Sequence, residues 1–102
     1  MGSASACLTV ILTGDGQVSA VGKRALLCGF AMQSDTSASN VVFENGSGGT
    51  EIWKHTMGAT TAAGDNCDVV VFPIPIEFNK DIYLNLSNTP QVSVSYILMD
   101  IS

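Results

Sequence analysis

The stretch that decides the fold class reads Asp68-Val69-Val70-Val71-Phe72-Pro73-Ile74-Pro75-Ile76-Glu77-Phe78. Its apolar side chains recur at every second residue, which predicts a strand with one apolar face formed by Val70, Phe72, Ile74, Ile76 and Phe78. Pro73 and Pro75 fall on the opposite face and have no amide hydrogen to donate to a ladder. We therefore expect this strand to lie at a sheet edge or to cross between two sheets.

The same two-residue period continues outward in both directions, and no segment shows the 3.6-residue period of a helix. The period places Leu8, Val10 and Leu12 on one face of the first strand. In Ala25–Gln33 it places Leu26, Cys28, Phe30 and Met32 on one face and Gly29 on the other, where we expect a close approach by another part of the molecule. A tight turn is expected at Gly14-Asp15-Gly16. The predicted strands are Leu8–Thr13, Gln17–Val21, Ala25–Gln33, Asn40–Glu44, Thr50–Met57, Asp68–Phe78, Ile82–Leu86 and Gln91–Ile101.

About eight short strands separated by regular turns predict an all-β fold, a two-sheet antiparallel sandwich that is jelly-roll-like. A chain of 102 residues has room for one such domain. We expect the β-sandwich domain to span residues 7–102. The small residues that precede it, 1–6, are expected to form a flexible N-terminal arm.

Charge excludes one class of partner and favours another. Four Lys and Arg residues against nine Asp and Glu residues give a net charge of −5, which argues against a nucleic-acid surface. Charged residues make up 13% of the chain, against about 25% in typical domains. A surface so poor in charge is typical of a protein that contacts other protein. No membrane span and no basic, apolar signal segment is evident, so we expect assembly in a cytoplasm.

The sequence offers little for catalysis. His55 is the single histidine, no G-x-S-x-G motif is present, and Gly46-Ser47-Gly48-Gly49 fits a hairpin turn better than a phosphate loop. Cys7 and Cys28 lie in apolar runs and are expected as buried thiols. The oxygens of Asp65, Asn66 and Asp68 suit Ca²⁺, although a solvated loop is favoured. We therefore expect no enzyme, no catalytic or metal-binding residue and no cofactor.

The chain ends supply the candidate partner-binding residues. The last predicted strand is apolar on both faces, with Val92, Val94, Tyr96 and Leu98 on one and Ile97, Met99 and Ile101 on the other. Either both faces are covered within the domain, or the end of the strand is buried against another subunit. The second option, with an N-terminal arm that pairs with a neighbouring chain, gives the candidates Met1, Gly2, Ser3, Ala4, Ser5, Ala6, Ile97, Met99 and Ile101.

Three pieces of the chain resemble small bacteriophage virion proteins. Leu26-Leu27-Cys28-Gly29-Phe30 is similar to a strand that follows their first hairpin, and Asn40–Ile52 resembles their unit of strand, Gly-rich turn and strand. Ile74–Phe78, Asp81–Leu84 and Val92–Tyr96 resemble their closing strands, with Asp81 where a glycine is common.

The resemblance implies a jelly roll or related sandwich, no catalysis and a place on the virion. The expected function is a head decoration (cement) protein that stabilises a phage capsid from its surface. The implied partners are the major capsid protein and further copies of this chain, as a homotrimer. Neither nucleic acid nor membrane is expected as a partner.

Two other functions stay open. A tail, fibre or vertex component of the virion would use the same sandwich at low copy number. A carbohydrate-binding or adhesin module would use Trp53 with Tyr83 or Tyr96 as a stacking surface.

Overall fold

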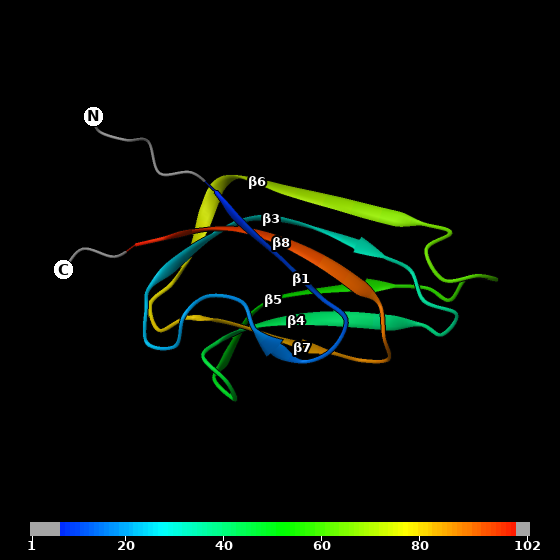
Figure 1. Cartoon of the computed structure of the whole chain (residues 1–102), viewed down its shortest axis with the longest axis horizontal. Helices are drawn as coiled ribbons and strands as arrows, with labels where there is room; N and C mark the ends of the chain where they lie inside the picture. The colour runs from blue at the N-terminus through cyan, green and yellow to red at the C-terminus, as the bar shows by residue number, and fades with distance from the viewer. Residues whose placement is uncertain (1–6, 100–102) are drawn as a thin grey trace.

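The computed structural model describes residues 7–99, and Figure 1 shows them as two packed sheets. The strands are β1 (Leu8–Leu12), β2 (Gly16–Gln17), β3 (Ala25–Gln33), β4 (Ser39–Asn45), β5 (Thr50–Met57), β6 (Cys67–Phe78), β7 (Ile82–Leu86) and β8 (Gln91–Leu98). One antiparallel sheet has the order β1-β8-β3-β6 and the other β2-β7-β4-β5. The predicted all-β two-sheet sandwich is confirmed. Among the described residues, no helix is long and apolar enough to cross a membrane.

The strand order follows from nested pairing. Strand β4 pairs with β5, β3 with β6, β2 with β7 and β1 with β8. The chain is therefore one long antiparallel hairpin whose successive strand pairs alternate between two sheets. Within each sheet, one further pairing joins the two strand pairs that the sheet contains. Strand β3 pairs with β8 in one sheet, and β4 pairs with β7 in the other. This topology is that of a jelly roll.

The core lies between the sheets and is formed by alternate residues of both. Phe43, Leu27, Met32, Phe78 and Ile82 are fully buried in it. Phe30 of one sheet packs against Phe43 of the other, with ring centroids 5.0 Å apart. The side of the sandwich between β5 and β6 is closed by Trp53 and Phe72, whose rings meet edge to face at 5.0 Å.

A bulge at Cys28 changes which side chains of β3 face the core. Leu27 pairs with Tyr96 of β8 and Gly29 with the next residue, Ser95, so Cys28 is an extra residue in β3. Ala25 and Leu27 are consequently buried together with Phe30 and Met32. The prediction that Leu26 and Cys28 share one face with Phe30 and Met32 was wrong, because a two-residue period assumes an unbroken ladder.

The approach predicted at Gly29 is confirmed. A Cβ added at Gly29 would lie 2.5 Å from the carbonyl oxygen of Val70 on β6. Only glycine lets the two backbones come this close.

Strand β6 is an edge strand, one of the two options predicted from its prolines. Its ladder with β3 breaks between Val71 and Ile76, where Phe72–Pro75 face the single residue Cys28. This break turns Ile74 outward, where it is 84% exposed. The prediction of one continuous apolar face along the strand was therefore wrong at Ile74, although Phe72 and Ile76 do pack against the core.

The first turn also differs from the prediction. Gly14 and Gly16 are absent from the positive-φ residues, and the segment carries the chain from β1 in one sheet to β2 in the other. Strand β2 is shorter than the predicted Gln17–Val21, because the amides of Val18 and Ser19 both donate to the carbonyl of Ile82. The remaining strand positions agree with the prediction to within a few residues.

Candidate interaction surface

The sheet β1-β8-β3-β6 presents an outer face without charge over its middle. Its pairing aligns outward residues of all four strands into two rows. One row is Ile11, Ser93, Ala31 and Val69, and the next is Thr9, Ser95, Gly29 and Val71. A third row, formed by Gln91, Gln33 and Cys67, is also uncharged.

Side-chain size gives this surface, which we call the trough face, its shape. The outer strands carry Ile11, Val69 and Val71, which are 58%, 69% and 72% exposed. The two inner strands carry Ser, Gly and Ala at the same level. A depression of about 270 Å³ lies there, between Ser93 and Ser95 on one side and Val69 and Val71 on the other. The trough face can therefore receive an uncharged ridge from another molecule.

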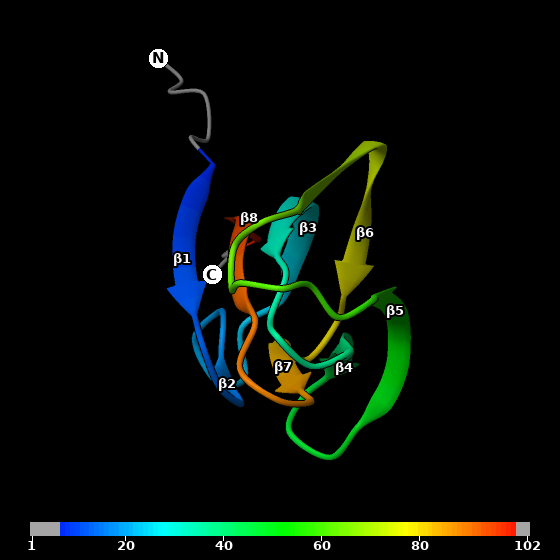
Figure 2. The same cartoon turned by 90° about the vertical axis from the view of Figure 1, so that its right-hand side faces the viewer.

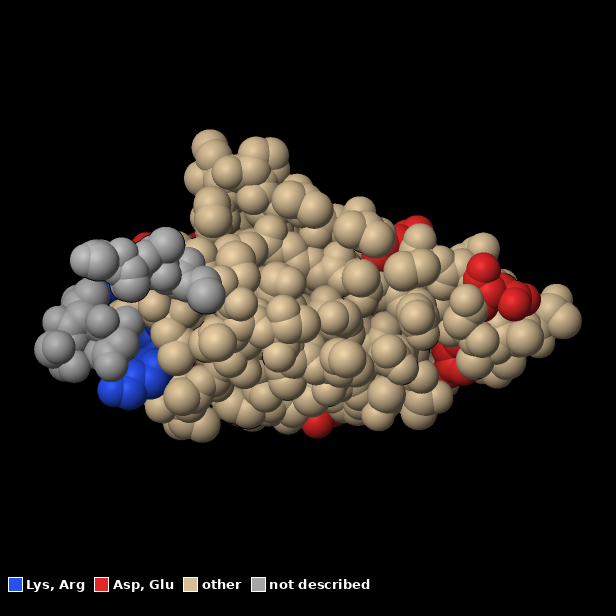
Figure 3. Space-filling view, turned by 45° about the horizontal axis from the view of Figure 1, so that its top comes forward, with Lys and Arg blue, Asp and Glu red and all other residues tan. Residues whose placement is uncertain are grey.

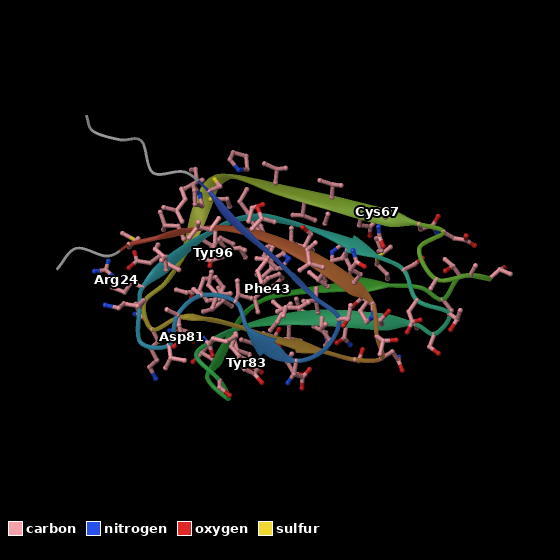
Figure 4. The ribbon with its side chains drawn as sticks, in the orientation of Figure 1. Arg24, Phe43, Cys67, Asp81, Tyr83 and Tyr96 are labelled. Atoms are coloured by element: carbon pink, nitrogen blue, oxygen red, sulfur yellow. The ribbon has the colours of Figure 1, made fainter. Side chains whose placement is uncertain are left out.

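On the face that Figure 3 shows, charged residues lie mainly toward the two ends. Figure 3 shows Lys and Arg at one end and most of the visible Asp and Glu toward the other, with a broad area of other residues between them. Arg24, at the basic end in Figure 4, forms an ion pair with Glu77 at 2.7 Å. The middle of the trough face thus has no charge to desolvate when it is covered.

The other sheet has an ordinary polar exterior. Its rows place Glu44 between Tyr83 and Glu51, and Val42 between Asn85 and Lys54. Charged and amide side chains keep such a face in water. The difference between the two exteriors identifies the trough face as the better candidate for a contact surface.

The predicted partner-binding residues are only partly within the described chain. Ile97 is half-buried on the outer face of β8 and pairs with Leu26 of β3. Met99 is also half-buried, and its amide donates to the carbonyl of Arg24 at 2.9 Å. Met1, Gly2, Ser3, Ala4, Ser5, Ala6 and Ile101 lie outside the described residues.

The two faces of β8 have different environments within the described residues. Strand β8 lies between β1 and β3, so it has a neighbouring strand on each side. Val92 and Val94 are fully buried on the core face. On the opposite face, its Ser93 and Ser95 form part of the trough.

The two cysteines expected in the core lie at the surface instead. Cys7 is exposed. Cys28 is half-buried, because the bulge at this residue turns its side chain away from the core. Their sulfur atoms are 3.8 Å apart. Burial and the contact with Cys7 raise the pKa of the Cys28 thiol, which keeps it protonated at neutral pH.

His55 and Asp68 form a link between the two sheets. Nε2 of His55 lies 2.8 Å from Oδ2 of Asp68, and the His55 ring packs edge-on to Phe30 at 5.5 Å between centroids. Strands β5 and β6 are thereby joined along the side that Figure 2 shows on the right. A depression of about 350 Å³ next to Asp68 is lined by polar and small residues, including Cys67 and Asn66.

The residues considered for Ca²⁺ have other roles. Oδ2 of Asp65 accepts a hydrogen bond from the amide of Ala62, and Asp68 points to His55. In the part of the chain that the structure describes, no three His, Cys, Asp or Glu side chains converge as metal ligands.

The aromatic residues considered for sugar binding do not share a surface. Trp53 packs against Phe72 at the edge of the sandwich, and Tyr96 packs against the core. Tyr83 lies on the outer face of β7, next to the buried Leu84. Figure 4 accordingly shows Tyr96 and Tyr83 on different sides of Phe43.

The trough face was missed in the sequence because it depends on register. Its residues come from four strands that are distant along the chain. The available signal was that the outward positions of four predicted strands carry uncharged residues, with Glu77 as the one exception.

Comparison with known proteins gives no relative for this chain: no family model, no curated protein and no solved structure matches it.

Proposed function

We propose that this protein is a non-enzymatic structural component that is built into a larger protein assembly through its trough face. In its specific form, the proposal is a decoration protein that binds the major capsid protein on the surface of a phage particle. The observation that carries the proposal is the uncharged, hollowed middle of one sheet exterior beside the charged exterior of the other sheet.

The physical argument concerns the cost of covering each face. Charged residues are depleted at the centres of protein interfaces because their desolvation opposes binding. Covering the trough face removes exposed apolar area of Ile11, Val69 and Val71 from water. This stabilises the complex by about 25 cal/mol for each Å² that is buried. A partner that binds the assembled shell and not its free subunits stabilises the shell by mass action.

The phage particle is supported by the sequence resemblance and by analogy of fold. Jelly rolls occur in viral capsid proteins and also in lectins, so the fold by itself does not select between them. The separation of Trp53, Tyr83 and Tyr96 makes a shared stacking surface for a sugar the weaker alternative.

Copy number in purified particles is the first test. Quantitative mass spectrometry against the major shell protein should give one copy per shell subunit or a simple fraction of that. A few copies per particle would instead indicate a tail, fibre or vertex component. Absence of the chain from particles would contradict the virion proposal.

A matched pair of variants tests the surface itself. Ala31→Arg places a charge in the trough, and Val42→Arg places the same charge on the outer face of the other sheet. We expect Ala31→Arg to weaken binding to phage particles from which this protein has been removed at least about tenfold, because a buried unpaired charge costs several kcal/mol. Val42→Arg should bind as the unchanged protein does. Equal effects of the two variants, with both folded by circular dichroism, would contradict the assignment of the trough face.

A further inference from the structure

The four sheet edges differ in how well they resist pairing with another strand. Strand β6 carries Pro73, Pro75 and a break in its ladder, and β5 carries Glu51 and Lys54. Strand β2 has only two residues. These features are the usual means by which proteins block edge-to-edge pairing.

Strand β1 has none of these protections. Its sequence Leu8-Thr9-Val10-Ile11-Leu12 contains no charge and no proline, and it pairs with β8 in unbroken register. Within residues 7–99 its other edge has no strand beside it. Leu8 is 43% exposed and Ile11 58%, so aliphatic area is exposed on the strand that forms this edge.

The residues of β1 are symmetric about Val10. In an antiparallel pair of β1 strands with Val10 opposite Val10, Leu8 of each copy faces Leu12 of the other, and Thr9 faces Ile11. Aliphatic residues then meet on the core side of the sheet. A β-branched pair meets on the outer side, an arrangement that stabilises cross-strand contacts.

We propose that a second copy of this chain pairs with the first through antiparallel contact of the two β1 strands, about a two-fold axis at Val10. The two sheets become one eight-stranded sheet in the order β6-β3-β8-β1-β1-β8-β3-β6. Such an interface is self-complementary, as a two-fold contact must be. It covers the free backbone groups of β1 and leaves the trough faces of both copies open on the same side.

This inference does not rest on the proposed function. It predicts a dimer, whereas the sequence resemblance implies a trimer. Five residue pairs bury less area than a standard interface, so we expect a dimer that dissociates at micromolar or higher concentration.

Sedimentation velocity over the micromolar range tests the pairing with matched variants. Ile11→Glu and Thr9→Lys each place a charge on the pairing edge, at an outward position where the folded domain tolerates it. We expect each to weaken the dimer at least about tenfold. Val69→Glu is the control for Ile11→Glu, because it places the same negative charge on the same outer face but on the opposite edge strand. It should leave the dimer unchanged.

The double variant Thr9→Lys with Ile11→Glu tests the register. In the proposed pairing, the introduced lysine of each copy faces the introduced glutamate of the other, so the dimer should recover most of its affinity and become sensitive to salt. An unchanged protein that stays monomeric or forms a trimer would overturn the proposal. So would a dimer that survives Ile11→Glu, that dissociates with Val69→Glu, or that the double variant does not restore.

Discussion

Asp81 is a buried carboxylate that joins three segments of the chain. It is 5% exposed, and its side chain accepts hydrogen bonds from Nε2 of Gln17 at 2.6 Å and from the amide of Gly22 at 3.0 Å. Its own carbonyl accepts from the amide of Gly46 at 2.9 Å. Asp81 is not among the positive-φ residues, so its turn does not require the glycine that is common there in the resembling proteins. The side chain at this position therefore has a structural role.

We expect Asp81→Ala to lower the free energy of unfolding by about 1–3 kcal/mol, because two partly buried donors lose their acceptor. Urea titration measures this loss. Asp81→Asn keeps one acceptor oxygen and should have an intermediate effect. A change of less than about 0.5 kcal/mol for the alanine variant would be that of an ordinary surface position and would contradict this role.

Asp35 makes the stability depend on pH. Hydrogen bonds from the amides of Thr89 and Thr36 hold the pKa of the Asp35 carboxyl below its ordinary value. Since the folded pKa is the lower one, the stability it adds is complete above the unfolded pKa of about 3.9. That stability is lost as the pH falls through the folded pKa.

Asp35→Ala removes this contribution. The difference in Tm between the unchanged protein and the variant should therefore be constant near neutral pH and shrink below about pH 4. Glu51→Ala, an exposed change on β5, serves as the control. A difference that does not vary between neutral and acid pH would show that the carboxylate adds no pH-dependent stability.

At the scale of the element, strands β3 and β6 are fitted to each other at Gly29. A Cβ at this position would lie 2.5 Å from the carbonyl oxygen of Val70, which is backbone and has little room to move. We expect Gly29→Ala to cost about 1–3 kcal/mol through forced separation of the strands. Gly14→Ala is the control, because nothing lies within 4 Å of its added Cβ. Equal thermal stability of the two variants would contradict the close fit.

The sequence predicted the strands well where their hydrogen-bond ladders are unbroken and failed where a ladder contains a bulge. The period of two located the strands and placed Leu8, Val10 and Leu12 on one face of β1. The prolines of β6 left two options, of which the edge position is the one observed. The period failed at Leu26, Cys28 and Ile74, because extra residues in one strand shift the phase of all that follow and leave no local signal. The candidate surface could not be predicted either, since the register that aligns Ile11 with Val69 is a property of the sheet.

At the scale of the whole molecule, most pairings join distant parts of the chain. In a fold dominated by such contacts, long loops must close, with a loss of conformational entropy, before the stabilising contacts can form. We expect refolding from urea in milliseconds to seconds, as followed by Trp53 fluorescence in a stopped-flow experiment. Refolding complete within microseconds would mean that local contacts dominate, in conflict with the nested topology.

From the nested pairing we expect an order of assembly in time that starts at the innermost pair. Once β4 and β5 pair, with Phe43 opposite Trp53, the loop that must close to bring Leu27 opposite Ile76 is shorter. Each pair in this way shortens the loop that the next pair must close. The last pair in this series joins Leu8 to Tyr96. In unfolding we expect the same series to run in reverse, so that the outermost pair, β1 with β8, separates first. A partner that holds β1 would therefore act on the step with which unfolding begins, and would slow the loss of the entire domain.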